Sequence, residues 1–351
     1  MIVSILLAVP SCNSTLADAL FSAGVCNDAL WKELWHACAG PLVILPGECE
    51  RVYYFPQGHM EQLQVPEGLE HQVPHQFQLP SKILCKVVSV CRMVEPETDE
   101  VYAQIDLLPE SDQPDELTSL DTLPPEPAGC KVHSFSKIIT HSDASSHGGF
   151  FIPRKYAIDC LPPLDMSQPS PSQVLVARDL HGYEWQFCHI YRGRPRRHLM
   201  NGWSVFARAK RLVAGDAFIF LKYNCGDFRV GFRRYMSQQP NRLPFVISRK
   251  STHMGILATA AHAIANGTLF SVLYKPSRFE FIVRVNKYLE ARNHHLSIGT
   301  RVAMRFEYEE VTEERFNGTI AGVGENFSPQ WNCSEWRSFK LMSLPFFHFI
   351  F

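Results

Sequence analysis

The sequence lacks the cysteine and histidine spacings that indicate a metal-binding module. It contains eleven cysteines and fifteen histidines, but no C-x-x-C pair and no Cys/His doublets at zinc spacing. An odd number of cysteines also argues against a complete disulfide framework. We therefore expect reduced, mostly buried thiols, as in cytosolic or nuclear proteins, and we expect no metal and no other cofactor.

Motifs for nucleotide and acyl chemistry are also missing. The chain has no G-x-x-x-x-G-K-[ST] loop, no G-x-G-x-x-G turn and no G-x-S-x-G elbow. Ser146 and His147 are adjacent, but neighbouring side chains seldom point at each other, so we do not expect an enzyme.

Long apolar runs are absent, and the apolar start MIVSILLAVPSC has no basic residues like those of a signal peptide. No membrane association is therefore expected. A secreted glycoprotein remains an alternative, because N-x-S/T sequons occur at Asn13, Asn266, Asn317, Asn326 and Asn332.

Net charge is nearly absent, at −1, but charges of opposite sign are separated along the chain. Residues 95–127 hold eleven acidic residues, six prolines and no lysine or arginine, whereas residues 190–234 hold eleven lysines and arginines against two aspartates. Guanidinium groups match phosphate oxygens and the O6/N7 edge of guanine, so this block is compatible with a nucleic-acid partner. Composition alone slightly favours a solvated edge or a nuclear-import signal. Four of the arginines lie in YRGRPRRHLM, residues 191–200: Arg192, Arg194, Arg196 and Arg197.

Hydrophobic periodicity predicts a mainly β protein with short helices, of the α+β class. A helix is expected in residues 27–40, ending at Gly40-Pro41, and strands are expected within 41–59 and 82–94. The acidic, proline-rich residues 95–127 are expected to form a connection or an irregular surface layer. The apolar face of the helix consists of Leu30, Trp31, Leu34, Trp35 and Cys38.

Two hairpins are predicted around the basic block. Residues 174–179 and 183–192 alternate across a turn at His181-Gly182, and residues 216–223 and 228–234 do so across NCGD. The arginine cluster then follows the end of a strand, in a loop, where binding residues are often placed.

A helix is also predicted over residues 254–265. Its larger apolar face consists of Ile256, Leu257, Ala260, Ala261 and Ile264, and the opposite face of Gly255, Ala258, Thr259 and His262. The small residues of this second face permit close approach of another backbone. Periodicity alone leaves open whether that backbone belongs to the same domain or to a second copy of the chain.

The order of several motifs resembles the plant auxin response factors. These motifs are ELWHACAGPLV, SDASSHGGFFIPRKYAIDCLPPLDMSQ, DLHGYEWQFCHIYRGRPRRHL and GILATAAHAIANGTLFSVLYKP, and the similarity covers roughly residues 28–340. The resemblance implies a B3-type seven-stranded pseudo-barrel, residues 130–234, inserted into a β-rich dimerisation domain built from 27–129 and 235–300. A small Tudor-like ancillary β unit would span 301–340. Residues 1–26 are an atypical N-terminus expected to be disordered, and 341–351 an atypical tail.

The resemblance also implies roles for individual residues in two DNA-binding loops. Base contacts fall to His147, Arg192, Pro195 and Arg197, and phosphate contacts to Lys137, Ser145, Ser146 and Arg196. Gly255 and Ala258 match positions where two protomers of the family meet, which favours the dimer reading of that helix.

The function implied is that of a nuclear, sequence-specific transcription factor without catalytic activity. Its partners would be double-stranded DNA at TGTC-containing auxin response elements and a second auxin response factor, in a homodimer or heterodimer. The family's middle region and C-terminal interaction domain do not occur in this sequence. We therefore expect no binding of auxin-sensitive repressors, and a competitor or repressor role at auxin-responsive genes.

Departures from the family pattern leave a second hypothesis open, that of a degenerate member acting by dimerisation without reading DNA. Arg194 stands where glutamine is usual, and the segment between His198 and Gly202 is one residue short. Ala144 and Ser146 replace threonines, and Ala261 replaces a tryptophan.

Overall fold

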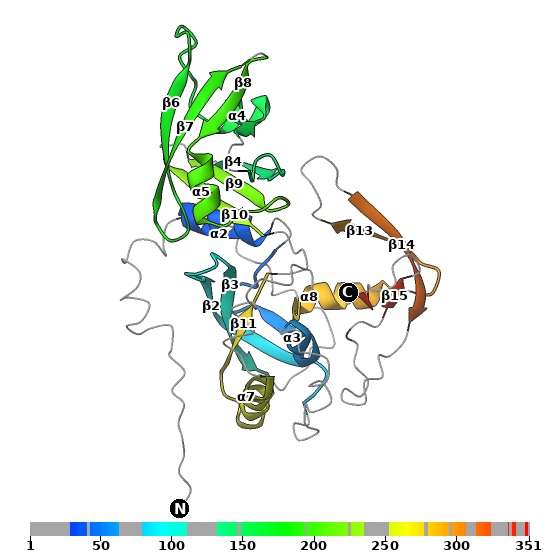
Figure 1. Ribbon diagram of the computed structural model, residues 1–351. Helices are drawn as coiled ribbons and strands as arrows, with labels where there is room; N and C mark the ends of the chain where they lie inside the picture. The colour runs from blue at the N-terminus through cyan, green and yellow to red at the C-terminus, as the bar shows by residue number, and fades with distance from the viewer. Residues whose placement is uncertain are drawn as a thin grey trace, which may run out of the picture. The chain divides into compact units, whose positions relative to one another are not determined.

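Chain segments from both sides of residues 130–234 come together in one unit of this structure, a computed structural model (Figure 1). Unit 1 consists of Met1–Cys38 and Cys130–Arg234, and unit 2 of Ala39–Gly129 and Tyr235–Phe351. The structure describes residues 29–40, 43–62, 79–110, 132–145, 149–193, 195–223, 226–234, 253–276, 280–294, 297–306, 314–323, 336, 339–341 and 348–349. The atypical N-terminus, residues 1–26, lies outside the described residues.

Unit 1 contains a seven-stranded sheet in the order β4-β9-β10-β6-β7-β8-β5. Neighbouring strands are antiparallel except β10 and β6, which are parallel. Both hairpins predicted from the sequence form, as β6 with β7 and β9 with β10. The strands are β4 (Val132–Ile138), β5 (Phe150–Ile152), β6 (Ser172–Arg178), β7 (Glu184–Arg192), β8 (Arg197–Asn201), β9 (Ala217–Tyr223) and β10 (Phe228–Arg233).

An aromatic core fills unit 1. The rings of Phe150 and Trp203 stack with centroids 4.1 Å apart, and both contact Phe218 edge-on. These side chains come from β5, from β9 and from the first turn of helix α5 (Trp203–Ala209). The core therefore joins the strand that follows the first expected DNA-binding loop to the helix that follows β8.

Helix α2 (Ala29–Ala39) belongs to unit 1, although the sequence interpretation grouped it with residues 27–129. All five residues of its predicted apolar face are buried. The indole of Trp31 donates to the carbonyl oxygen of Leu180 at 2.8 Å. Leu34 and Cys38 pack so closely on β10 that a Cβ at Gly231 would lie 2.6 Å from the Cys38 sulfur.

Unit 2 contains a five-stranded sheet in the order β11-β3-β2-β1-β12. Strand β3 corrects the sequence interpretation, because it lies inside the acidic stretch that was expected to be a connection. Apolar and polar residues alternate from Ala103 to Leu107, and Ala103, Ile105 and Leu107 are buried, while the strand itself lies between β2 and β11 in the sheet. The strands are β1 (Arg51–Tyr54), β2 (Ile83–Val94), β3 (Val101–Pro109), β11 (Phe270–Tyr274) and β12 (Ile282–Arg284).

Three helices accompany this sheet: α3 (Pro56–Gln62), α7 (His253–Asn266) and α8 (Val285–Asn293). Helix α7 packs against β11 and β3 (Figure 1). Helix α3 replaces part of the strand expected before residue 59. None of the described helices is long and apolar enough to cross a membrane.

A four-stranded sheet, β13-β14-β15-β16, completes unit 2. Its strands are β13 (Arg301–Phe306), β14 (Glu314–Val323), β15 (Phe339–Leu341) and β16 (His348–Phe349). Two residues of the atypical tail, His348 and Phe349, thus pair with β15. Trp336 is fully buried and packs on α3, where its indole donates to the carboxylate of Glu61 at 2.9 Å.

Candidate nucleic-acid interface

The described arginines of the cluster lie where β7 and β8 meet: Arg192 ends β7, Arg197 begins β8, and Arg196 lies between the two strands. Arg192 and Arg197 are the last pair of this hairpin and stand directly opposite each other. Residues opposite each other in an antiparallel pair project from the same face of the sheet. Gly193 has a φ of 103°, a left-handed conformation that glycine adopts without steric cost. Arg192 and Arg197 therefore project from the same face at the turn end of the hairpin.

These arginines are open to solvent. Arg192, Pro195, Arg196 and Arg197 are all exposed, and no carboxylate among the described residues forms an ion pair with any of the three arginines. Exposed like charges in one turn repel each other, so the site favours an anion that would relieve the repulsion.

Aromatic rings hold two of the guanidinium groups. The Arg196 group lies 6.0 Å from the ring centroid of Tyr191, on β7, and the Arg197 group lies 5.5 Å from that of Phe151, on β5. Cation–π contacts of this kind restrict the side chain without neutralising its charge. The Arg197 contact also links the turn to the strand that follows the first expected loop.

A chain of neutral hydrogen bonds supports the base of the hairpin. The amide nitrogen of Gln173 donates to the carbonyl oxygen of Pro162 at 2.6 Å and lies 3.1 Å from Nδ1 of His189. An amide nitrogen only donates, so His189 Nδ1 accepts and its Nε2 carries the proton. That proton is donated to Nδ1 of His198 at 3.0 Å. The order of donors thus runs from Gln173 through His189 to His198.

The pKa values of both histidines in this hydrogen-bond chain are lowered, which favours the neutral form. Burial, followed by the neighbouring His198, lowers the pKa of His189 to about 4. Burial and the nearby charge of Arg154 lower the pKa of His198. The ring of His198 in turn lies 4.7 Å from that of Tyr191, which lies under Arg196. The hydrogen-bond chain therefore ends at His198, which contacts the ring that lies under the exposed Arg196.

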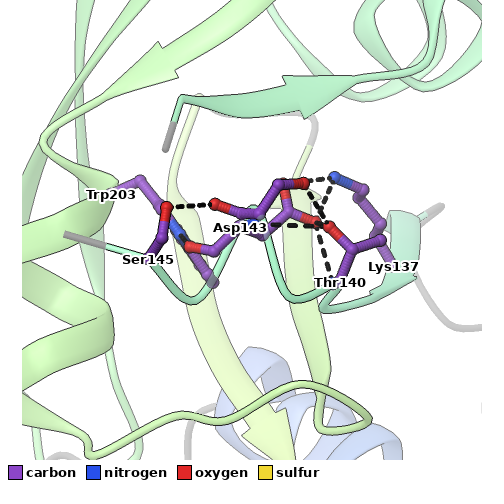
Figure 2. A network of polar contacts seen from close by, with 6 residues as sticks. Lys137, Thr140, Asp143, Ser145 and Trp203 are labelled. Atoms are coloured by element: carbon purple, nitrogen blue, oxygen red, sulfur yellow. Dashed lines mark hydrogen bonds and ion pairs between the residues drawn. The ribbon is translucent and has the colours of Figure 1, made fainter. Parts of the chain in front are cut away.

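A buried aspartate organises the start of the first loop (Figure 2). Asp143 accepts hydrogen bonds from the backbone nitrogen of Thr140 at 3.0 Å and from its hydroxyl at 2.8 Å, while its own nitrogen donates to that hydroxyl at 3.2 Å. Reciprocal bonds of this kind are those of a capping box, and they fix the turn of residues 140–144. The Ser145 hydroxyl continues the turn by donating to the carbonyl oxygen of Ser142 at 2.8 Å.

Lys137 and Trp203 attach this turn to the core. The Lys137 ammonium contacts both carboxylate oxygens of Asp143, at 2.9 and 3.0 Å, and lies 4.1 Å from the ring centroid of Phe150. The Trp203 indole donates to the carbonyl oxygen of Asp143 at 2.8 Å. Only 13% of the Lys137 side chain and 4% of the Asp143 side chain are exposed. A phosphate contact by Lys137 would require this ion pair to open.

The remaining predicted DNA contacts divide into two groups. Ser145 is exposed at the end of the described part of the first loop, whereas Ser146 and His147 lie outside the described residues. Arg194, a departure from the family pattern, also lies outside them. The segment between His198 and Gly202, which was expected to be a shortened loop, is part of β8. It pairs with β7 without a register shift from Arg197 to Asn201.

The two residues expected at a dimer interface lie on α7. Gly255 is exposed and Ala258 is partly buried, while Leu257, Ala260 and Ala263 are buried. Gly255 and Ala258 therefore lie on the side of α7 that the described part of the chain leaves uncovered or only partly covered.

The residues that stabilise the first loop and the β7–β8 hairpin were not predicted from the sequence. Thr140 and Asp143 match the pattern [ST]-x-x-[DE], which would have indicated a capping box. Gln173 and His189 had no such signal, because their contact depends on the pairing of β6 with β7.

Two parts of the chain match known families. Residues 135–235 match the B3 DNA binding domain, and residues 281–343 match the auxin response factor ancillary domain. The ancillary match begins upstream of residue 301, where the sequence interpretation placed that unit.

Several curated proteins match nearly the whole chain. Auxin response factor 1 of Arabidopsis thaliana is 63% identical over 91% of this chain and 48% of its own length. Auxin response factor 7 of Oryza sativa subsp. japonica is 60% identical over 90% of this chain and 47% of its own length. The chain thus spans about half the length of these curated relatives.

Among solved structures, the Arabidopsis FUS3-DNA complex is similar with 24% identity and a TM-score of 0.26, over 28% of this chain and 95% of that one. The Arabidopsis thaliana transcription factor LEC2-DNA complex has 18% identity and a TM-score of 0.26, over 29% and 95%.

The seven-stranded sheet and the matched residues 135–235 define this part of unit 1 as a B3 DNA binding domain. With the ancillary domain and relatives at 53–63% identity over about 90% of its length, the chain belongs to the auxin response factor family.

Proposed function

We propose that this chain is a sequence-specific DNA-binding transcription factor of the auxin response factor type, acting in the nucleus on auxin-responsive genes. It binds double-stranded DNA at TGTC-containing elements, as a homodimer or as a heterodimer with another family member. Membership of the family and the B3 match support this proposal. The observation that carries it is the pair Arg192 and Arg197, exposed and opposite each other at the end of a rigid hairpin.

A two-stranded hairpin suits the major groove, which is about 12 Å wide and admits a two-stranded ribbon. Arg192 and Arg197 each donate two hydrogen bonds to a guanine, while Pro195 shapes the turn and contacts a base edge. Pro195 fixes its own φ, which reduces the entropy lost when the turn binds. Arg196, held over Tyr191, contacts a phosphate and sets the position of the turn.

The first loop supplies the second half of the interface. His147 contacts a base, and Ser145 and Ser146 contact phosphates. The capping box of Thr140 and Asp143 supports this assignment, because it fixes the chain that leads into these residues. A fixed loop loses less conformational entropy on binding than a flexible one.

Dimerisation uses the exposed side of α7, where Gly255 and Ala258 permit the helices of two protomers to approach closely. Two linked B3 domains then bind paired sites, and the second contact forms at high effective concentration.

A gel-shift titration on duplexes with paired, single and scrambled TGTC sites tests the proposal. We expect the tightest binding on the paired duplex and weaker binding on the single site. Equal affinity for all three duplexes, with dimerisation retained, would instead support the degenerate member that dimerises without reading DNA. This alternative is retained because Arg194, Ala144 and Ala261 depart from the family pattern.

A further inference from the structure

Helix α4 (Arg154–Cys160) begins near the arginine turn, the connection between Arg192 and Arg197, although at least 38 residues separate the two in the sequence. Strand β5 pairs with β8 so that Ile152 stands opposite His198, the residue after Arg197. Continuing β5 by two residues brings Arg154 toward the turn end of the hairpin. Helix α4 packs against β8, as Figure 1 also shows.

Arg154 has the exposure and charge of a ligand-binding residue. Its side chain is exposed, and no carboxylate among the described residues pairs with it. Its charge also contributes, after burial, to the lowered pKa of His198, which independently places the guanidinium near the base of the turn. Arg154 thus adds a further positive charge to the surface of Arg192, Arg196 and Arg197.

We propose that Arg154 is a further phosphate-binding residue of the DNA interface, contacting the backbone on the side of the groove next to the 193–196 turn. This inference rests on the proposed function. When the turn enters the major groove, β5 and the start of α4 lie at the edge of the groove, where the phosphates are. Arginine binds a phosphate through two parallel hydrogen bonds, and such contacts fix orientation without selecting a sequence.

Position distinguishes Arg154 from Arg178, another exposed arginine of unit 1. Arg178 is also exposed, but it pairs with Glu184 at the opposite end of β7 from Arg192. Removal of either side chain deletes one positive charge from the same domain. Only Arg154 lies at the end that carries the arginine turn, so Arg178→Gln is a matched control.

The test measures the Kd of the full chain for a TGTC duplex and a scrambled duplex over a series of salt concentrations. A phosphate contact contributes about 0.9 to the slope of log K against log salt. We expect Arg154→Gln to reduce this slope by about 0.9 on both duplexes and to weaken both by a similar several-fold factor. Arg178→Gln should leave the slope unchanged, and Arg154→Lys should retain it because the charge remains.

An unchanged slope for Arg154→Gln, or the same change for Arg178→Gln, would overturn the proposal. A selective loss on the TGTC duplex would overturn it too, because it would show that Arg154 reads a base. The proposed function is tested separately, by whether the wild type binds the TGTC duplex more tightly than the scrambled duplex. The slope on scrambled DNA can show a phosphate contact even when that preference is absent.

Discussion

Arg192 and Arg197 stand directly opposite each other as the closing pair of the β7–β8 hairpin, with both side chains exposed. Like charges in this position destabilise a hairpin, typically by a few tenths to 1 kcal/mol. Asp or Glu at either position would relieve the repulsion. The pair is therefore explained better by an anionic partner than by the stability of the fold. The Phe151 ring restrains Arg197, and the Tyr191 ring restrains the neighbouring Arg196.

Substitution of Lys137 tests whether this residue stabilises the first loop through Asp143 or contacts a DNA phosphate directly. We expect Lys137→Met to keep the packing on Phe150, to leave the Asp143 carboxylate without its cation and to lower the free energy of unfolding by about 2–3 kcal/mol. DNA binding should weaken because the loop loosens, with the salt slope unchanged. Urea unfolding and salt titrations measure both effects. A slope reduced by about 0.9 would show that Lys137 contacts a phosphate directly.

The histidine chain predicts a loss of stability in acid. Since the folded-state pKa of His189 is about 4 and the ordinary value is 6.5, the unfolded chain binds more protons between these values. The free energy of unfolding should therefore fall as the pH drops from about 6.5 toward 4, by at most about 3 kcal/mol from this residue.

His189→Gln is the matched variant for this prediction, because its amide nitrogen can still donate to His198 but does not titrate. Its urea midpoint should fall less steeply with pH than that of the wild type. A residual dependence is expected, since the pKa of His198 is also lowered. Parallel pH profiles for the two proteins would show that His189 is not the group responsible.

Gly58 and Trp336 form a testable contact within unit 2. A Cβ at Gly58 would lie 2.2 Å from the Trp336 ring, so we expect Gly58→Ala to displace the indole and to lower stability by about 2–4 kcal/mol. In a Trp336→Ala background the clash is gone, and alanine in helix α3 should then stabilise by up to about 1 kcal/mol. Urea unfolding of the four proteins measures this reversal of sign. The same loss in both backgrounds would disprove the contact.

A substitution on the exposed side of α7 should disrupt the proposed dimer. Gly255→Glu places a charge where two protomers are proposed to approach, so we expect a shift toward monomers in analytical ultracentrifugation. Affinity for a single TGTC site should change little, whereas the advantage of paired sites should disappear. Thr268→Glu, exposed beyond the end of the same helix, serves as the control. An unchanged sedimentation coefficient for Gly255→Glu would exclude this side of α7 as the interface.

Local patterns in the sequence were enough to predict α2 and both hairpins. The five apolar residues of α2 follow the helical period, and Trp185, Phe187 and His189 follow the strand period, so burial could be assigned from spacing. Strand β3 was missed because acidic residues and prolines flank it, and its burial depends on β2 and β11 pairing on either side.

The candidate site was only partly predictable for the same reason. Spacing placed four arginines in one loop, but it could not show that Arg192 and Arg197 would be opposite each other. That relationship depends on the register of β8 against β7, which sets every cross-strand neighbour. Likewise, Arg154 comes near the turn only through the pairing of β5 with β8.

The most direct test of base reading by the turn is the ratio of Kd values on scrambled and TGTC duplexes, measured at one salt concentration for the wild type and Arg197→Ala. Loss of a bidentate contact to guanine costs about 1–3 kcal/mol on the cognate site. We therefore predict that the ratio falls by about 5- to 150-fold in the variant, chiefly through weaker cognate binding. A ratio equal to that of the wild type, with both duplexes bound equally less well, would contradict the account.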